Sequence, residues 1–594
     1  MTTLKKIDKD SSEGVDNRLS FFSIPSTNVG IQRSAYKEIL PLNALNQSAG
    51  PFIFRYFGDS LYLDLSKTFL SLILSLERKD VASGEWIPIS DGEAADLKGD
   101  KFAGVVQYLG LTWIRRLTLS INGIQCYDSG IHYAYRCILL HELGADREVS
   151  KGIYEAALYY KDAVDKDDFE GSGFKSRASR FAKGKLCRMF SHLDYDMARQ
   201  NQLLIPHSDV IWTIYRNSDE FLIHTPKYRS AAALVDNNNT YRLRLHDMRI
   251  FVKQVDLSMS LNNAIARHLE QSPAKYAYRK IDIRSVFLGK GRQEITHAAF
   301  TSTCPRRLII SFVSSPAFTG NTALSPFTFE HANLRTVSAE FGGFQFPAVS
   351  YDFDFTDNNF VRAYVDMFVG MDLDNWPNID QRTLDISMKE FSKSSCFFVI
   401  PMTSTLEDTN GLELIRQGTT TVRCIFNQPI KDDGYEMIIM GEFDSILSIN
   451  ADRVLSTDGS GVFSSNNIPN IERNKPFCFI ANTMRKGTIG EHWIACYSDS
   501  KNTLEYFDSL GDTPNCDMRQ SMLNRFSIVK QSRYSLQSPL SDTCGHYCIC
   551  FLVLRSRQGS NFSSTLQKLH SIPSESRDAV LKRLVQRLAF LPSI

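Results

Sequence analysis

The last quarter of the chain contains the residue types that a cysteine-based catalyst requires. A cysteine nucleophile needs a base that takes its proton, a group that orients the base, and hydrogen-bond donors for the oxyanion of acyl transfer. Residues 492–544 offer one candidate for each role. The candidates are His492 as the base, Asp508 as its orienting partner, Gln537 as an oxyanion donor and Cys544 as the nucleophile. This ordered set predicts the triad of a cysteine peptidase.

The elements expected around these residues would bring them together. His492 starts an apolar strand and Asp508 closes the next one. Neighbouring antiparallel strands would place the two side chains side by side, where a carboxylate fixes the imidazole tautomer. Cys544 begins a helix expected over 544–554, and a helix N-terminus lowers the pKa of a thiol. Gly545, which follows it, is expected to let a substrate approach closely.

Metal binding is the alternative within the same motif. Cys544, His546, Cys548 and Cys550 form a dense group of metal-ligating types. On a helix Cys544 and Cys548 share one face, whereas His546 and Cys550 point elsewhere. The spacing therefore favours thiol chemistry without a metal or any other cofactor, and it favours Cys548 and Cys550 as packing residues.

The composition excludes several classes of protein. Of 594 residues, 43% are hydrophobic, and 67 Lys and Arg balance 66 Asp and Glu. That apolar content is enough for real cores, and the near-zero net charge argues against a general nucleic-acid or membrane-surface binder. The N-terminus lacks a signal-peptide pattern, and no apolar run approaches the roughly 20 residues of a membrane span. We expect an intracellular protein, in cytoplasm or nucleus, that is not secreted, has no membrane contact and keeps its 12 cysteines reduced.

Residues 20–450 show the alternation of half-buried β-strands. Leu117, Leu119 and Ile121 alternate with polar residues before Asn122-Gly123, a pair that favours a tight hairpin turn. The length exceeds what one sandwich needs. We therefore predict a mostly β protein with a first sandwich at 20–245, a second at 246–453 and an α+β domain at 454–594.

A basic stretch, Gly171 to Lys185, interrupts the first predicted sandwich. Its composition is typical of a solvated surface loop. A weak nucleic-acid contact is the alternative that we keep open for this stretch.

The C-terminal domain resembles the adenain and ubiquitin-like-protease family of cysteine proteases, which includes SUMO-deconjugating enzymes. The matching residues are Gly461-Val462-Phe463, Ala481-Asn482-Thr483, His492-Trp493, Phe507-Asp508, Gln537 and Cys544-Gly545. The resemblance implies a papain-like α+β fold, the four catalytic roles given above, and Trp493 packed beside the triad near the substrate. It also implies cleavage at glycine-containing sites, as in the viral branch of the family.

The β-rich body resembles the hexon-type capsid proteins of Polinton or Maverick elements and related adintoviruses. The resemblance rests on Tyr62 to Thr68, Leu119 to Gly123, Ala157 to Asp162 and Ser325 to Phe329. It implies a double jelly roll, assembly as a homotrimer, and a place in a virion-like particle.

Together these patterns predict a cysteine endopeptidase that cleaves at glycine-containing sites and is fused to a capsid-like body. Its substrate would be a protein or peptide such as a viral precursor. One alternative is an isopeptidase that acts on SUMO or another ubiquitin-like modifier. Another is a structural capsid protein whose protease tail is inert or removes itself near Asp458-Gly459-Ser460-Gly461.

Overall fold

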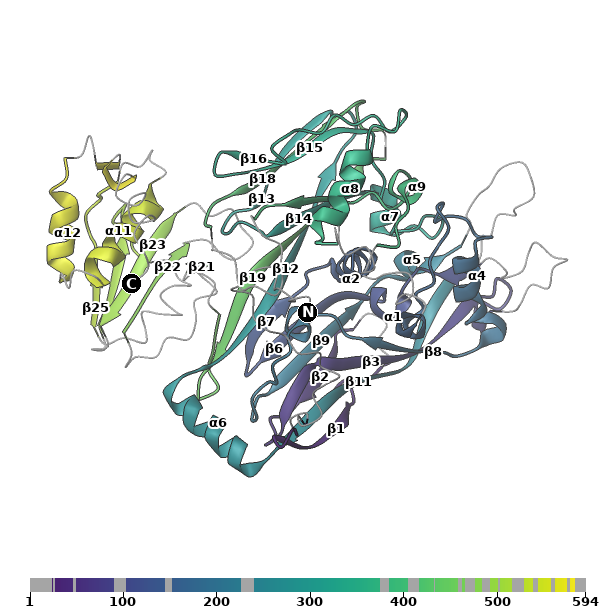
Figure 1. The fold of residues 1–594 in the computed structure, drawn as a ribbon, viewed down its shortest axis with the longest axis horizontal. Helices are drawn as coiled ribbons and strands as arrows, with labels where there is room; N and C mark the ends of the chain where they lie inside the picture. Colours follow the sequence, from purple (N-terminus) through teal and green to yellow (C-terminus); the bar gives the residue numbers. More distant parts are fainter. Residues whose placement is uncertain are drawn as a thin grey trace, which may run out of the picture. The chain divides into compact units, whose positions relative to one another are not determined.

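A computed structural model describes most of the chain as two compact units, residues 1–457 and 458–594 (Figure 1). The described residues are 24, 27–45, 50–89, 103–144, 152–225, 240–373, 384–403, 416–431, 433–457, 462–464, 476–482, 492–499, 503–514, 528–537, 543–556, 561–573, 577–578 and 580–582. The expected cleavage segment at 458–461 lies outside them, as do Thr483 and most of the helix expected after residue 576.

The first sandwich has two main antiparallel sheets. One has the order β1-β11-β3-β4 with β8 on β3, and the other β2-β9-β6-β7. The strand bounds are β1 Ile31–Ile39, β11 Tyr241–Leu257, β3 Tyr62–Lys79, β4 Trp86–Pro88, β8 Cys187–His192, β2 Phe52–Tyr56, β9 Val210–Arg216, β6 Ile114–Ile121 and β7 Ile124–Asp128. Two short strands, β5 Gly104–Val105 and β10 Ile223–His224, form a separate two-stranded antiparallel sheet. The β6–β7 hairpin turns at Asn122 and Gly123 with φ of 50° and 79°, which confirms the predicted turn.

The second sandwich repeats this plan. Its sheets have the orders β12-β19-β14-β17, with β20 on β19, and β13-β18-β15-β16. The strands are β12 Ala274–Leu288, β19 Tyr435–Ile449, β14 Arg307–Ser314, β17 Phe398–Pro401, β20 Leu455–Thr457, β13 Glu294–Phe300, β18 Thr420–Phe426, β15 Leu334–Phe341 and β16 Phe344–Phe346. Period-2 alternation therefore predicted the class of both sandwiches.

The division predicted at residues 245 and 246 is wrong. Strand β11 runs through it and pairs with two strands of the first sandwich, with β3 from Tyr241 to Val255 and with β1 from Ile250 to Leu257. The second sandwich begins only at Ala274, after helix α6 Met259–Gln271. The lower bound predicted for the last domain, 454, also lies too early, because β20 pairs with β19. Alternation marks a strand but not the sheet that it joins.

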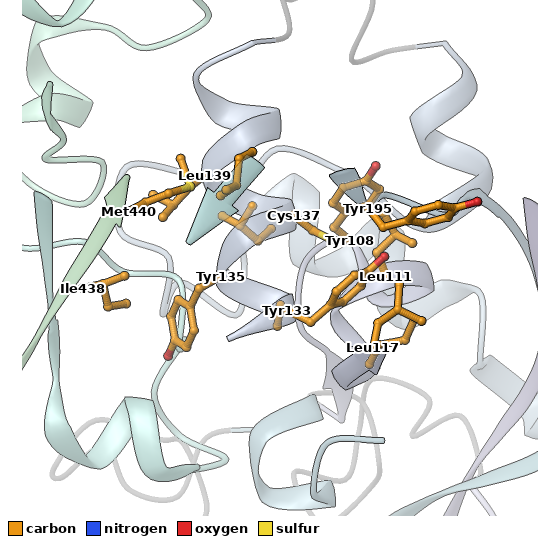
Figure 2. Packing of buried hydrophobic residues seen from close by; sticks show 14 of the residues in the cluster. Tyr108, Leu111, Leu117, Tyr133, Tyr135, Cys137, Leu139, Tyr195, Ile438 and Met440 are labelled. Atoms are coloured by element: carbon orange, nitrogen blue, oxygen red, sulfur yellow. The ribbon is translucent and has the colours of Figure 1, made fainter. Parts of the chain in front are cut away.

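One hydrophobic core is continuous through both sandwiches. Helix α2, Tyr133–Glu142, lies within it: Leu139 lies toward Met440 of β19, and Tyr133 toward Leu117 of β6 (Figure 2). The remaining helices of this unit are α1 Leu109–Thr112, α4 Ser172–Ser179, α5 Asp219–Leu222, α7 Ser315–Thr319, α8 Val361–Gly370 and α9 Met388–Phe391. Three 3-10 turns lie at Ile153–Ala157, Ala182–Gly184 and Asp196–Arg199.

The basic stretch is more ordered than the expected loop. Helix α4 occupies most of it, and the Arg177 side chain is 1% exposed. Its guanidinium forms an ion pair with Asp162 at 2.8 Å and donates to the carbonyl oxygen of Val105 at 2.9 Å. Arg177 is therefore an internal anchor, and it is not accessible to a polyanion.

The C-terminal unit contains one five-stranded sheet of order β21-β22-β23-β24-β25. The strands are β21 Val462–Ser464, β22 Pro476–Asn482, β23 Trp493–Asp499, β24 Thr503–Asp508 and β25 Ile528–Gln531, followed by helices α11 Cys544–Ser556 and α12 Phe562–His570. Helix α11 packs on the sheet (Figure 1). The rings of Phe507 on β24 and Phe551 on α11 stack there with their centroids 4.4 Å apart. The strand predicted to start at His492, the strand predicted to end at Asp508 and the helix predicted for 544–554 are confirmed as β23, β24 and α11.

The chain's described helices are all too short or too polar to cross a membrane.

Candidate active site

The end of β24 and the start of β23 bring the predicted base to its orienting carboxylate. The two strands are antiparallel, with Ile494 opposite Asp508, so His492 lies beside the end of β24. His492 Nε2 lies 2.8 Å from Asp508 Oδ1. Asp508 is 1% exposed, and its Oδ1 also accepts from the backbone N–H of Leu510 at 2.8 Å. The carboxylate is fixed, and it holds the imidazole in one orientation.

The predicted nucleophile stands where a helix begins. Cys544 is the first residue of α11, directly after Thr543. The side chain is hydrogen-bonded to His492. Because Asp508 engages Nε2, Nδ1 is the ring nitrogen left for the thiol. The three residues predicted as a triad therefore lie together.

The electrostatics of this pair favour charge separation. Burial raises the pKa of the Cys544 thiol. Three effects oppose burial and together outweigh it: the hydrogen bond from His492, the backbone groups of Trp493 and Gly545, and the imidazolium charge. The pKa of the thiol therefore lies below its usual value. Burial lowers the pKa of His492, but Asp508 and Cys544 together raise it to about 9. Near neutral pH the arrangement favours a thiolate and an imidazolium, which is the reactive form of a cysteine nucleophile.

Gln537 joins this group through the residue that follows Asp508. Its backbone N–H donates to the carbonyl oxygen of Ser509 at 3.1 Å, and its side-chain Oε1 accepts from Ser509 Oγ at 2.7 Å. Gln537 is 4% exposed, in the loop before α11. A side-chain amide held in this way can present its N–H₂ end to an oxyanion.

Trp493 and Gly545 touch each other beside the thiol. A Cβ added at Gly545 would meet only Trp493 Cδ1, at 3.9 Å, which is an ordinary contact. A side chain as small as a methyl group would therefore fit beside Trp493 at the start of the helix without a clash. Trp493 is half-buried and its carbonyl oxygen lies 3.3 Å from the Sγ of Cys548.

The two later cysteines of the cluster are packing residues. Cys548 and Cys550 belong to the hydrophobic core of this unit. Burial raises the pKa of both thiols, that of Cys550 to about 11. In the described part of the chain, no three histidine, cysteine or acidic side chains are close enough to hold a metal ion.

A buried ion pair braces the sheet behind the site. Arg555 of α11 donates to both carboxylate oxygens of Glu505 on β24, at 2.5 and 2.9 Å, and the two side chains are 8% and 5% exposed. Two aligned hydrogen bonds fix the helix relative to the strand that ends in Asp508. Sequence reasoning missed this pair, since nothing in the spacing links residues 505 and 555.

Comparisons with known proteins cover most of the chain. No family model matches the chain. An uncharacterized protein of Caenorhabditis elegans is 25% identical over 430 residues, which cover 72% of this chain and 97% of that protein.

Solved structures also resemble most of the chain. The structure of the Sputnik virophage, determined by cryo-electron microscopy, matches with a TM-score of 0.50 and 11% identity over 76% of this chain and 94% of that one. The crystal structure of the mavirus major capsid protein matches with a TM-score of 0.44 and 11% identity over 77% and 97%. Most of the chain therefore has the capsid-like double jelly-roll fold, in two mostly β sandwiches.

Proposed function

We propose that the C-terminal unit is a cysteine peptidase carried by a capsid-type body. One observation carries the catalytic part of this proposal, namely the hydrogen-bonded series from Asp508 through His492 to Cys544. A buried cysteine that served only for packing would have a raised pKa, as Cys548 and Cys496 do, but the pKa of Cys544 is lowered.

The reaction follows from the charges of this series. The Cys544 thiolate attacks a scissile carbonyl carbon, and the carbonyl oxygen becomes an oxyanion that Gln537 and the Cys544 backbone N–H stabilise. The His492 imidazolium gives its proton to the leaving amine, and a thioester remains on the sulfur. His492, now neutral, takes a proton from water, whose oxygen attacks the thioester carbon; the carbon–sulfur bond breaks, the acid leaves, and the Cys544 thiolate is restored beside the His492 imidazolium.

The substrate proposed for this site is a peptide or protein with glycine at the cleaved bond. The lack of a side chain at Gly545, which directly follows Cys544, supports close approach of an acyl group that itself lacks a side chain. A glycine-containing viral precursor and the glycine end of a ubiquitin-like modifier share this chemistry.

The test uses the full-length protein and its Cys544→Ala variant. Fluorogenic peptides that end in glycine, and vinyl-sulfone probes made from SUMO and ubiquitin, are incubated with both proteins. Cleavage or labelling that Cys544→Ala abolishes supports the proposal, and the preferred probe identifies the substrate class. Cleavage by the alanine variant at the wild-type rate would refute it, as would a wild-type protein that neither cleaves nor labels.

The second function that we propose is assembly of the body into a shell. The double jelly-roll fold supports it, because the Sputnik virophage structure shares this fold over 94% of the matched chain. Purified full-length protein examined by sedimentation and negative-stain microscopy should form trimers or closed particles. A protein that stays monomeric at high concentration would refute the proposal that the body assembles into a shell. If particles form and no peptidase activity is found, the tail is inert and the protein is structural.

A further inference from the structure

The carboxylate that orients His492 belongs to a residue whose backbone is held by a side chain. Asp508 is the last residue of β24, and its backbone N–H donates to Ser532 Oγ at 2.8 Å. Ser532 Oγ in turn donates to the Asp508 carbonyl oxygen at 2.9 Å. A backbone N–H can only donate and a carbonyl oxygen can only accept, so both roles of the hydroxyl are fixed. One hydroxyl group therefore engages both backbone groups of Asp508.

Ser532 stands where strand β25 has just ended. The last pair of the parallel strands β24 and β25 is Tyr506 with Gln531, and the N–H of Ser532 still donates to the Tyr506 carbonyl oxygen at 3.1 Å. In a continued ladder a backbone carbonyl oxygen of β25 would accept the next N–H of β24 on this side, that of Asp508. Here the Ser532 hydroxyl accepts it. The side chain thus extends the hydrogen bonding of the sheet to the end of β24.

Burial makes these two bonds difficult to replace. Asp508 and Ser532 are each 1% exposed, so water has little access to the backbone groups that the hydroxyl engages. A buried N–H or C=O that loses its partner is costly, and the end of β24 would shift to relieve that cost in a Ser532→Ala variant. The contact at risk is the one from His492 Nε2 to Asp508 Oδ1, which at 2.8 Å tolerates only a few tenths of an ångström of displacement.

The loop that follows Ser532 is anchored independently of this hydroxyl. The N–H groups of Leu536 and Gln537 donate to the Ser509 carbonyl oxygen, at 2.8 and 3.1 Å. The Leu536 carbonyl oxygen accepts from Arg577 Nη1 at 2.8 Å. None of these bonds involves the Ser532 side chain. Its replacement should therefore act on the end of β24 and leave the path of the loop as it is.

We propose that Ser532 is a positioning residue that fixes the end of β24, so that the Asp508 carboxylate stays against His492. This proposal rests on the proposed peptidase function. It assigns to Ser532 no contact with the substrate and no proton transfer. The whole effect of Ser532 on catalysis passes through Asp508.

The test is a double-mutant cycle in the full-length protein, with Ser532→Ala, Asp508→Asn and the double variant. The His492 ring is titrated by NMR in protein that carries carbon-13 at the histidine Cε1 atoms, and a His492→Gln variant assigns its signal. This titration needs no substrate. In parallel, kcat/KM is measured on a glycine-ended fluorogenic peptide between pH 5 and pH 10.

Two further variants separate the hydroxyl from its surroundings. Ser498→Ala is the matched control, because Ser498 is also fully buried in this sheet and its hydroxyl has no partner among the described residues. Ser532→Cys keeps nearly the same shape with a weaker donor and acceptor, so it perturbs the strand end more gently than alanine does.

In the wild type the ring should titrate with the raised pKa of about 9 that Asp508 and Cys544 give His492. A displaced carboxylate stabilises the imidazolium less, so Ser532→Ala should lower this pKa by at least about 0.5 and kcat/KM at pH 8.5 by about 10-fold. Ser532→Cys should fall between alanine and the wild type. In the Asp508→Asn background the alanine change should move the pKa by less than about 0.2, because the charge that Ser532 positions is gone. Ser498→Ala should match the wild type.

Three results would overturn the inference. A Ser532→Ala variant with the wild-type pKa of His492 and wild-type kcat/KM would show that the strand end is held without the hydroxyl. A pKa decrease that is as large in the Asp508→Asn background as in the wild type would mean that Ser532 acts on His492 by another route than the carboxylate. A wild-type protein in which His492 titrates near 9 but which cleaves no peptide would overturn the peptidase function, and the catalytic role of Ser532 with it. The substrate-free titration therefore separates failure of this role from failure of the peptidase function.

Discussion

Replacing Asp508 with asparagine tests the charge separation at the site most directly. The pKa of His492 is about 9, against an ordinary value of 6.5. Two partners raise it against the effect of burial, and of the two Asp508 contributes more than Cys544. Removal of the carboxylate should therefore lower the pKa of His492 by more than half of this difference, and we expect a His492 pKa below about 8 in Asp508→Asn.

The predicted change is large enough to measure in a pH profile. The leaving amine needs the imidazolium proton, so activity is lost as the pH rises through the pKa of His492. At pH 8.5 about three quarters of wild-type molecules would carry the imidazolium, but less than about one quarter of the variant molecules would. The alkaline limb of kcat/KM should fall near pH 9 in the wild type and below about pH 8 in Asp508→Asn.

The control for this prediction is another carboxylate of the same loop. Asp512 is exposed, and Asp512→Asn should keep the wild-type profile. Both variants are assayed on a glycine-ended fluorogenic peptide between pH 5 and pH 10. If the alkaline limbs of Asp508→Asn and the wild type coincide, the carboxylate does not hold the imidazolium, and the reasoning from the 2.8 Å contact is refuted.

Two further predictions concern neighbouring parts of the C-terminal unit. Gly545→Ala should fold at least as well as the wild type, because the added Cβ meets only Trp493 at 3.9 Å and alanine favours a helix by up to about 1 kcal/mol. Its kcat/KM should fall about 100-fold through a displaced acyl group, and wild-type activity at unchanged thermal stability would refute a role of the glycine in substrate approach. Arg555→Met leaves the Glu505 carboxylate buried without its bidentate partner and should cost the unit about 3–5 kcal/mol in urea unfolding. The double variant with Glu505→Leu should recover most of that loss, and a single-variant cost below about 1 kcal/mol would contradict the reasoning.

Much of the site could be predicted from the sequence because its parts are local. His492 and Asp508 flank two short strands whose alternation is clear, and an antiparallel pair fixes which residues end up adjacent. Cys544 opens an apolar helix, so its place at a helix N-terminus follows from the pattern alone. The positions of the strands and the helix, which periodicity predicts, are what bring these residues close together.

The remaining parts depend on the path of loops, which periodicity does not describe. Ser509 stands next to Asp508 in the sequence, but its bond to Gln537 exists only because the loop before α11 returns to that strand end. The carbonyl anchored by Arg577 lies 41 residues before that arginine. In the sandwiches, the boundary predicted near residue 245 is wrong for the same reason. The pairing of β11 with β3 joins segments far apart in the sequence, and periodicity does not report it.

The pairing of β11 with β3 also means that β3 is synthesised long before the strand with which it pairs. Arg78, near the end of β3, pairs with Tyr241, so 163 residues must be added before the bond to β11 can begin to form. A ribosome needs about 8–33 s for this length at about 5–20 residues per second. Throughout that time the leucine-rich strand β3 exposes one unpaired edge, which is the kind of surface that recruits other chains. We expect the yield of folded protein to depend on how well this edge is protected while the next 163 residues are being made.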